Sequence, residues 1–180
     1  MAVRLAGAVL AGLLALGTVP AAAQTVVLVR HGEKAHAPGD PDPALSEAGQ
    51  ARAAALAEAL GGARVTAVLT SQFRRTRDTA APVATAAGVA AETVAIEGRD
   101  VAGQAAAVAR RLKGLKPGET AVVVGHSNTL PALIAALGGP AVPELQECEY
   151  DRLFVLVPGG ERPTLVQARY GASTAGCAGR

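Results

Sequence analysis

Aromatic residues are scarce in this 180-residue sequence, which contains two Tyr, two Phe and no Trp. Half of the residues are apolar, so a folded core has to form from many small contacts between aliphatic side chains rather than around a few large rings. The chain also offers little surface on which nucleobases could stack, which disfavours a nucleotide substrate.

An excess of charge of either sign is also missing. The chain has 17 Lys and Arg against 15 Asp and Glu, and its formal net charge is +2. A dedicated nucleic-acid-binding protein needs a basic patch or stripe, so this composition argues against nucleic acid as a partner. High hydrophobicity with a net charge near zero also argues against intrinsic disorder. The length fits one domain of ordinary size.

Long apolar runs are absent except at the beginning, over residues 5–19. A positively charged start precedes this run and three alanines ending at Ala23 follow it, which is the layout of a secretory signal. The run is shorter than the ~20 residues that span a bilayer, so a permanent membrane anchor is the weaker interpretation. We therefore predict a signal peptide over residues 1–23 and a mature domain over residues 24–180. The protein would be periplasmic or secreted, with no stable membrane anchor after cleavage.

Cysteine is limited to Cys148 and Cys177. An even count in an exported protein predicts a disulfide, with two unpaired thiols as the alternative. Two strand-like segments, 152–158 and 163–170, flank a Pro-Gly-Gly-Glu turn, and the resulting hairpin would bring the two cysteine-bearing ends together. Such a bridge would stabilise the fold by roughly 3–4 kcal/mol in the chain-entropy model.

Strand and helix patterns alternate along the mature chain. The predicted strands cover residues 25–30, 65–70, 93–96 and 120–125, and the predicted helices cover residues 46–60, 74–87, 101–115 and 129–137. This alternation indicates βαβ units and an α/β fold. We predict a three-layer α/β/α sandwich with a mostly parallel mixed sheet, to which the C-terminal β-hairpin adds antiparallel strands.

The ends of three predicted strands carry residues suited to chemistry: Arg30 and His31 at the first, Arg74 and Arg75 after the second, and His126 after the third. Ligands of open α/β sheets bind outside the carboxyl ends of the parallel strands. Two of the three histidines of the chain therefore fall at one edge, together with arginines.

This combination indicates phosphoryl transfer. The planar guanidinium of Arg matches phosphate oxygens and stays charged at any working pH, and helix N-termini add further donors. A neutral imidazole held in one tautomer can attack phosphorus, and a second, protonated imidazole can stabilise the transferring group. The sequence contains no GxxxxGK loop, no aspartate-rich cluster and no zinc-ligand spacing, so we predict neither a metal nor a cofactor.

Four segments carry a joint signature: LVRHGEK at 28–34, LSEAG at 45–49, SQFRRTRDTA at 71–80 and VGHSNT at 124–129. Together they resemble the histidine phosphatase (phosphoglycerate mutase-like) superfamily, and the resemblance covers nearly all of residues 25–170. It implies a covalent phosphohistidine intermediate on His31. It also implies a phosphate pocket formed by Arg30, Arg75 and His126, because the family pattern places its arginine at Arg75 and not at Arg74.

The resemblance also implies substrate contacts at Ser127 and Asn128, and it departs from the family pattern at the leaving-group acid. Many family phosphatases have an Asp directly after the second His, where this chain has Ser127, or a Glu in a Gly-rich insert that is reduced here to residues 97–100. The candidate acids are therefore Glu33, Glu97 and Asp100, although Asp100 is also suited to cap the next helix.

The sequence thus predicts a metal-independent phosphomonoesterase that acts on a small phosphorylated substrate or a phosphoprotein. One alternative is a member of the same fold that binds phosphate or another anion with little or no turnover. A more remote alternative is a serine hydrolase using Ser127, which lies between a strand and a helix. That order of residues needs a later histidine, and none follows His126.

Overall fold

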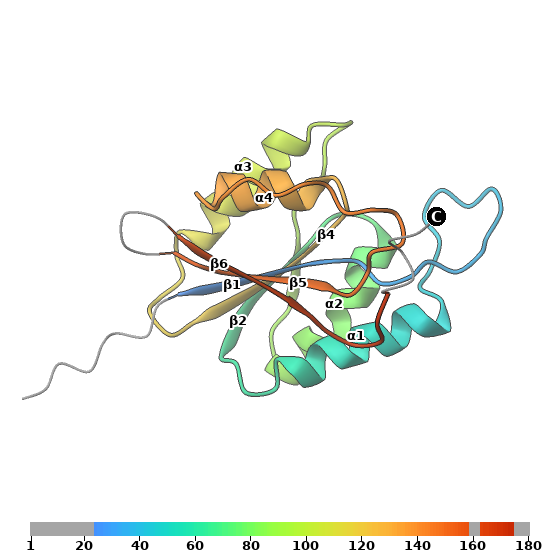
Figure 1. Ribbon diagram of the computed structural model, residues 1–180, viewed down its shortest axis with the longest axis horizontal. Coiled ribbons are helices and arrows are strands. Elements are labelled where there is room, and N and C mark those ends of the chain that lie inside the picture. The colour runs from blue at the N-terminus through green and yellow to red at the C-terminus, as the bar shows by residue number, and fades with distance from the viewer. Residues whose placement is uncertain (1–23, 159–162, 175–180) are drawn as a thin grey trace, which may run out of the picture.

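Six strands form one mixed sheet in the order β3-β2-β4-β1-β5-β6 (Figure 1). The structure is a computed structural model that describes residues 24–158 and 163–174. The predicted signal peptide over residues 1–23 lies outside these ranges and stays a prediction. Within the described ranges, no helix is long and apolar enough to cross a membrane.

Three strands in the parallel half of the sheet have most of their residues buried. Strands β1 (Thr25–Arg30) and β2 (Val65–Thr70) flank β4 (Thr120–Gly125), and all three run in the same direction. All six residues of β4 are buried, as the prediction of a strand covered on both faces requires. Because the three strands are parallel, their carboxyl ends meet at one edge of the sheet.

The C-terminal hairpin completes the sheet on the other side of β1. Strand β5 (Arg152–Val157) pairs antiparallel with β1 and with β6 (Thr164–Arg169). Because β5 is antiparallel to β1, the segment that enters β5 lies at the edge where β1 ends. The predicted mixed sheet with a C-terminal hairpin is confirmed.

Two helices cover each face of the sheet (Figure 1). One pair consists of α1 (Glu47–Ala59) and α2 (Arg74–Ala87), and the other of α3 (Val101–Leu112) and α4 (Thr129–Ala136). Two clusters of buried aliphatic residues fill the spaces between the layers, one on each face. Val27 and Val29 of β1 point into one cluster, and Val26 and Leu28 into the other. The predicted three-layer α/β/α sandwich is confirmed.

The third strand is the exception among the predicted ranges. Strand β3 covers Ala91–Thr93 and not residues 93–96, because β2 ends at Thr70, the residue opposite Thr93. Beyond this point the side-chain amide of Gln72 replaces a strand, accepting from the N–H of Ile96 at 2.9 Å and donating to its carbonyl at 3.1 Å. Ile96 was predicted to lie in a strand, but its backbone hydrogen bonds are made with a side chain and not with a neighbouring strand.

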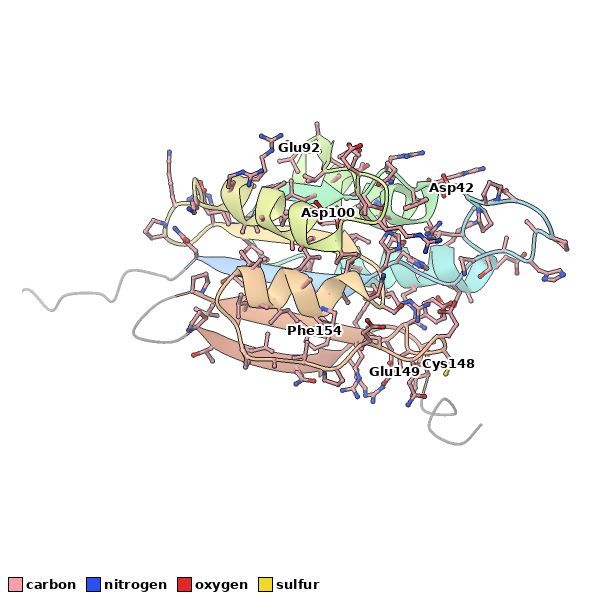
Figure 2. All side chains as sticks on the ribbon, turned by 90° about the horizontal axis from the view of Figure 1, so that it is seen from above. Asp42, Glu92, Asp100, Cys148, Glu149 and Phe154 are labelled. Atoms are coloured by element: carbon pink, nitrogen blue, oxygen red, sulfur yellow. The ribbon has the colours of Figure 1, made fainter. Side chains whose placement is uncertain are left out.

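The connection from α4 to β5 contains Cys148, which is disulfide-bonded. Its predicted partner, Cys177, lies outside the described residues. Figure 2 shows Cys148 and Glu149 at the same end of the molecule as Asp42, which precedes α1. The disulfide therefore belongs to the segment that enters β5, at the end of the sheet where the parallel strands terminate.

Candidate active site

The two strand-end histidines are neighbours because their strands are in register. Arg30 of β1 is opposite Gly125 of β4, so His31 and His126 each follow one member of this pair. The N–H of His31 donates to the Gly125 carbonyl at 3.0 Å, and the two imidazole centroids are 5.3 Å apart. The prediction that these two side chains meet at one edge is confirmed.

The His31 imidazole is held in one tautomer. Its Nδ1 is 2.7 Å from the carbonyl of Gly32, and because a carbonyl only accepts, Nδ1 is the nitrogen that bears the proton. Nε2 is then left with its lone pair. Burial, together with the positive charges of Arg30 and Arg75, lowers the pKa of His31 to about 3. At neutral pH the ring is therefore uncharged.

A chain of hydroxyl groups fixes the second histidine. Nε2 of His126 is 2.9 Å from Oγ of Ser71, which is 2.9 Å from Oγ1 of Thr76. Thr76 Oγ1 lies 2.8 Å from the carbonyl of Phe73 and donates to it. Ser71 therefore donates to Thr76 and accepts from His126, so Nε2 of His126 carries a proton. The other nitrogen, Nδ1, has no hydrogen-bond partner among the described residues.

The pKa of His126 is also lowered to about 3, by burial and by the proximity of His31, Arg75 and Arg30. The sequence suggested a protonated second histidine. In this structure the ring is neutral at neutral pH, because it lies among the same cations that would hold a phosphoryl group.

Arg30 is the most buried charged residue of the site, with a relative exposure of 1%. Its Nη1 donates to the carbonyls of Gln146 and Glu147, both at 2.8 Å, and the ring of Tyr150 stacks 4.1 Å from its guanidinium carbon. Nη2 donates to a carboxylate oxygen of Glu147 at 3.0 Å. The segment that enters β5 therefore fixes the guanidinium in place.

Arg75 belongs to the first turn of α2 and approaches the site from the other side. Its guanidinium lies 4.2 Å from the ring centre of Phe73 and makes a 3.4 Å contact with Asp42. The Nε atoms of both Arg75 and Arg30 are buried and have no hydrogen-bond partner. Both arginines line one pocket, where their positive charges are suited to an anion.

These side chains line an open pocket of about 480 Å³. Its lining consists of Arg30, His31, Lys34, Phe73, Arg75, Ile96, Gly98, Arg99, Val101, His126, Ser127, Asn128 and Glu147. All six residues predicted for the catalytic or substrate-binding site are in this set, whereas Arg74 is not. The pocket contains two imidazoles, four cationic side chains and a single carboxylate, so it is suited to an anion.

The first N–H groups of α2 and α4 differ in their partners. At α2 the N–H of Arg74 is taken by the carboxylate of Asp42, with both oxygens at 2.9 Å. At α4 the backbone N–H groups of Ser127 and Asn128 have no acceptor within the described residues. Because both residues line the pocket, the N-terminus of α4 offers free donors to an anion.

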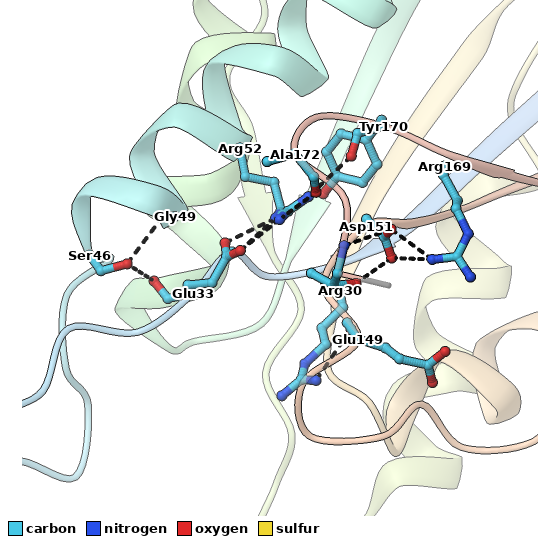
Figure 3. A network of polar contacts seen from close by, with 12 residues as sticks. Arg30, Glu33, Ser46, Gly49, Arg52, Glu149, Asp151, Arg169, Tyr170 and Ala172 are labelled. Carbon is cyan, nitrogen blue, oxygen red and sulfur yellow. Dashed lines mark hydrogen bonds and ion pairs between the residues drawn. The ribbon is translucent and has the colours of Figure 1, made fainter. Parts of the chain in front are cut away.

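The three carboxylates that the sequence suggested as acids lie elsewhere. Glu33 is bound by Arg52 at 2.6 Å (Figure 3), and although burial alone would raise it, these hydrogen bonds keep the pKa of Glu33 below its ordinary value. Asp100 caps α3 by accepting from the N–H of Gly103 at 2.8 Å. Glu97 lines a separate depression together with Asp100. None of the three lines the pocket that contains both histidines.

The functional residue that sequence reasoning missed is Glu147. It lines the pocket from the segment before β5 and contacts Arg30 at 3.0 Å and Lys34 at 3.4 Å. No periodicity or motif marks this segment. The one available signal was its proximity to Cys148, which the predicted disulfide would hold beside the hairpin.

Gly32 and Gly49, which belong to two different signature segments, pack against each other. The backbone after His31 packs so closely on α1 that a Cβ atom at Gly32 would lie 2.8 Å from the carbonyl oxygen of Gly49. The N–H of Gly32 also donates to Oγ1 of Thr79 at 2.8 Å. The LSEAG and SQFRRTRDTA segments thus place the backbone on which the His31 tautomer depends.

Metal ligation has no visible basis in residues 24–158 and 163–174, where no group of three or more His, Cys, Asp and Glu is placed to hold a metal ion. Ser127 has no hydrogen bond to a histidine in the same ranges, since His126 is engaged with Ser71. The geometry of a serine hydrolase is therefore not formed around Ser127.

Fold and site together define an α/β protein with an oxyanion-binding pocket at the carboxyl edge of its parallel strands. Residues 26–97 match the family model described as histidine phosphatase superfamily (branch 1). This match covers three of the four signature segments and agrees with the resemblance. A comparison with curated proteins finds no match.

Several solved structures share the fold of this chain. The mycobacterial glucosyl-3-phosphoglycerate phosphatase Rv2419c is 21% identical, with coverage of 84% of this chain and 100% of its own and a TM-score of 0.61. The protein histidine phosphatase SixA, complexed with tungstate, is 20% identical over 81% of this chain and 96% of its own, with a TM-score of 0.62. Bacillus stearothermophilus YhfR is 20% identical over 80% and 96% of the two chains, with a TM-score of 0.61.

Proposed function

We propose that the protein is a metal-independent phosphomonoesterase that acts through a phosphohistidine on His31. The observation that carries the proposal is that a neutral, tautomer-fixed His31 lines one pocket together with His126, Arg30 and Arg75. The match of residues 26–97 to the histidine phosphatase family model and the phosphatases among the structural neighbours support a phosphatase-type activity. One neighbour is complexed with tungstate and another with inorganic phosphate, both tetrahedral oxyanions.

The first step is attack of His31 Nε2 on phosphorus. The P–Nε2 bond forms as the bond between phosphorus and the leaving oxygen breaks, and the imidazolium charge is balanced by the transferred group. Arg30 and Arg75 hold the phosphoryl oxygens through their guanidinium groups, and the free N–H groups of Ser127 and Asn128 add further donors. Water then attacks phosphorus, the P–Nε2 bond breaks and His31 is regenerated.

His126 stabilises the transferring group once the anion is bound. The cations that lower its pKa are then balanced by phosphoryl oxygens, and protonation of Nδ1 becomes favourable. Because Nε2 is already committed to Ser71, the new proton is placed on the nitrogen that is free to donate. The second histidine thus acts as a donor that charges on substrate binding.

The substrate class is a small phosphorylated molecule or a phosphoprotein. The open pocket of about 480 Å³ admits a phosphoryl group on a side chain as well as one on a small metabolite. Only one aromatic side chain, Phe73, lines it, so a stacking platform for nucleobases is missing from the described pocket. We also propose export, because the leader over residues 1–23 has the layout of a secretory signal.

The test is hydrolysis of an activated aryl phosphate in EDTA by the wild type and by His31→Ala. We expect activity in the wild type and a loss of at least ~10³-fold in the variant, since covalent catalysis needs the nucleophile. His36→Ala is the matched control, because His36 is exposed and outside the pocket.

Other outcomes separate the alternatives. Equal activity of the wild type and His31→Ala would contradict the assignment of the nucleophile. An inactive wild type that binds inorganic phosphate as tightly as His31→Ala would instead favour the anion-binding role. Labelling of Ser127 by a fluorophosphonate would favour the serine hydrolase.

A further inference from the structure

The pocket contains one carboxylate with no role in phosphate binding. Glu147 contacts Nη2 of Arg30 at 3.0 Å and Nζ of Lys34 at 3.4 Å, and its side chain is 74% exposed. Burial lowers the pKa of Arg75, and the negative charge of Glu147 acts against this lowering. The carboxylate therefore lies at the mouth of the pocket, among three of its cations.

The segment that bears Glu147 is firmly held. Arg30 binds the carbonyls of Gln146, Glu147 and Glu149 at 2.8, 2.8 and 3.3 Å, and the side chain of Glu149 accepts from the N–H of Gln146 at 2.9 Å. Cys148 adds a disulfide to the same turn. The backbone of Glu147 is thus fixed while its carboxylate reaches solvent, which is how a proton-transferring group must be placed.

The direction of the reaction agrees with this placement. His31 follows the end of β1, is 3% exposed and forms the floor of the pocket. In an in-line transfer the leaving oxygen departs on the side of phosphorus opposite the nucleophile. With His31 on the floor, that side faces the mouth, where Glu147 is the one carboxylate lining the pocket in the described part of the chain.

We propose that Glu147 is the general acid that protonates the leaving oxygen, an inference that rests on the proposed phosphatase function. As Nε2 of His31 bonds to phosphorus, the P–O bond breaks and the leaving oxygen takes the carboxyl proton of Glu147, so the product departs as a neutral alcohol. In the second step the carboxylate of Glu147 takes a proton from water. The resulting hydroxide equivalent attacks phosphorus, and the P–Nε2 bond returns its electron pair to His31.

Binding of the substrate prepares this carboxyl group. The phosphoryl oxygens compete with Glu147 for Arg30 and Lys34, the two cations that the carboxylate contacts. A carboxylate displaced in this way is released from both cations and lies beside the bound substrate. The substrate class follows from this role: with an acid at the mouth, esters of ordinary alcohols are substrates as well as activated aryl esters.

The test compares two esters that differ in their need for a proton. An aryl phosphate releases a stable phenolate, whereas an alkyl phosphate releases an alkoxide unless an acid protonates it. We expect Glu147→Gln to lower kcat/KM for the alkyl ester by about 10²–10³-fold and for the aryl ester by less than about tenfold. The parameter kcat/KM covers only the steps up to departure of the leaving group, so slow hydrolysis of the phosphohistidine does not disturb the comparison.

Two further variants sharpen the result. Glu144→Gln removes the same charge from an exposed position on the same segment outside the pocket, and we expect it to keep the wild-type ratio of the two kcat/KM values. Glu147→Asp retains a carboxyl group and should recover part of the alkyl ester activity.

Each remaining outcome overturns a stated claim. Equal losses on both esters, or no loss on either, would show that Glu147 binds or repels phosphate without protonating the leaving group. A wild type that hydrolyses neither ester would overturn the phosphatase function itself, and the inference with it.

Discussion

His31 and His126 have their ring centres 5.3 Å apart, with the ring planes at 65°. This relationship is a consequence of strand register, because each histidine directly follows one member of the pair Arg30 and Gly125 on adjacent parallel strands. Ser71 follows β2 on the far side of β4, so the nucleophile, the second histidine and its hydroxyl partner lie in a row along one sheet edge. The sheet itself therefore positions the reacting groups.

The histidine pair makes stability depend on pH. Both pKa values fall from 6.5 to about 3 on folding, so the unfolded chain binds protons between these pH values and the folded protein does not. The contribution of the two histidines to the free energy of unfolding is fully present above pH 6.5. It decreases as the pH falls, by up to about 1.4 kcal/mol per pH unit for each histidine. Urea unfolding between pH 4.5 and 7.5 measures this slope.

The variant His126→Gln should reduce that slope by about one proton, because Gln keeps a polar group near Ser71 but does not titrate. His36→Gln is the control, since His36 lies in an exposed loop. An unchanged slope in His126→Gln would show that His126 is protonated to the same extent in the folded and unfolded states.

Ser71→Ala is expected to lower kcat by about ten- to a hundredfold, with a smaller effect on KM. The change removes the acceptor that holds Nε2–H of His126 at 2.9 Å, so the ring loses its fixed orientation without losing its charge. Steady-state kinetics at several pH values measure the effect, and a shifted pH profile would show that Ser71 acts through His126. A change confined to thermal stability, with kcat unaltered, would reduce Ser71 to a purely structural role.

Gly49→Ala should destabilise the protein by about 1–3 kcal/mol, the usual range for overpacking. A Cβ atom at Gly49 would collide with the backbone of Glu33, two residues after His31. Gly62→Ala is the matched control, because a Cβ atom there meets nothing within 4 Å. Chemical unfolding compares the two variants, and similar stabilities would contradict the close packing of α1 on the strand end.

Arg52→Met should destabilise the fold by about 3–5 kcal/mol, because it leaves the half-buried carboxylate of Glu33 without its partner. Arg52 also donates to the carbonyls of Tyr170 at 3.1 Å and Ala172 at 3.0 Å, so it joins α1 to the chain after β6 (Figure 3). The double variant with Glu33→Gln should recover part of the loss. A single variant as stable as the wild type in urea unfolding would show that the ion pair does not contribute to the fold.

Local sequence features determined most of the architecture and the catalytic residues. Runs such as TAVVVG are buried strands because nothing in them is polar enough to face water, and Gly61 and Gly62 directly follow the helix that precedes β2. Arg30, His31, Arg75 and His126 were predictable because parallel strands bring their carboxyl ends to one edge. The sequence therefore determined which groups could react.

Only the tertiary structure decided what surrounds those groups. Asp42, from the loop before α1, occupies the N-terminus of α2, and Arg52 draws Glu33 away from the pocket. Glu147 enters the site because β5 is antiparallel to β1, so the segment leading into β5 has to return to the edge where β1 ends. These are contacts between residues far apart in the sequence, and no local pattern encodes them. The histidines and arginines of the pocket follow from the order of strands along the chain, whereas the position of Glu147 and the charge balance of the pocket follow from how distant loops close over the sheet edge.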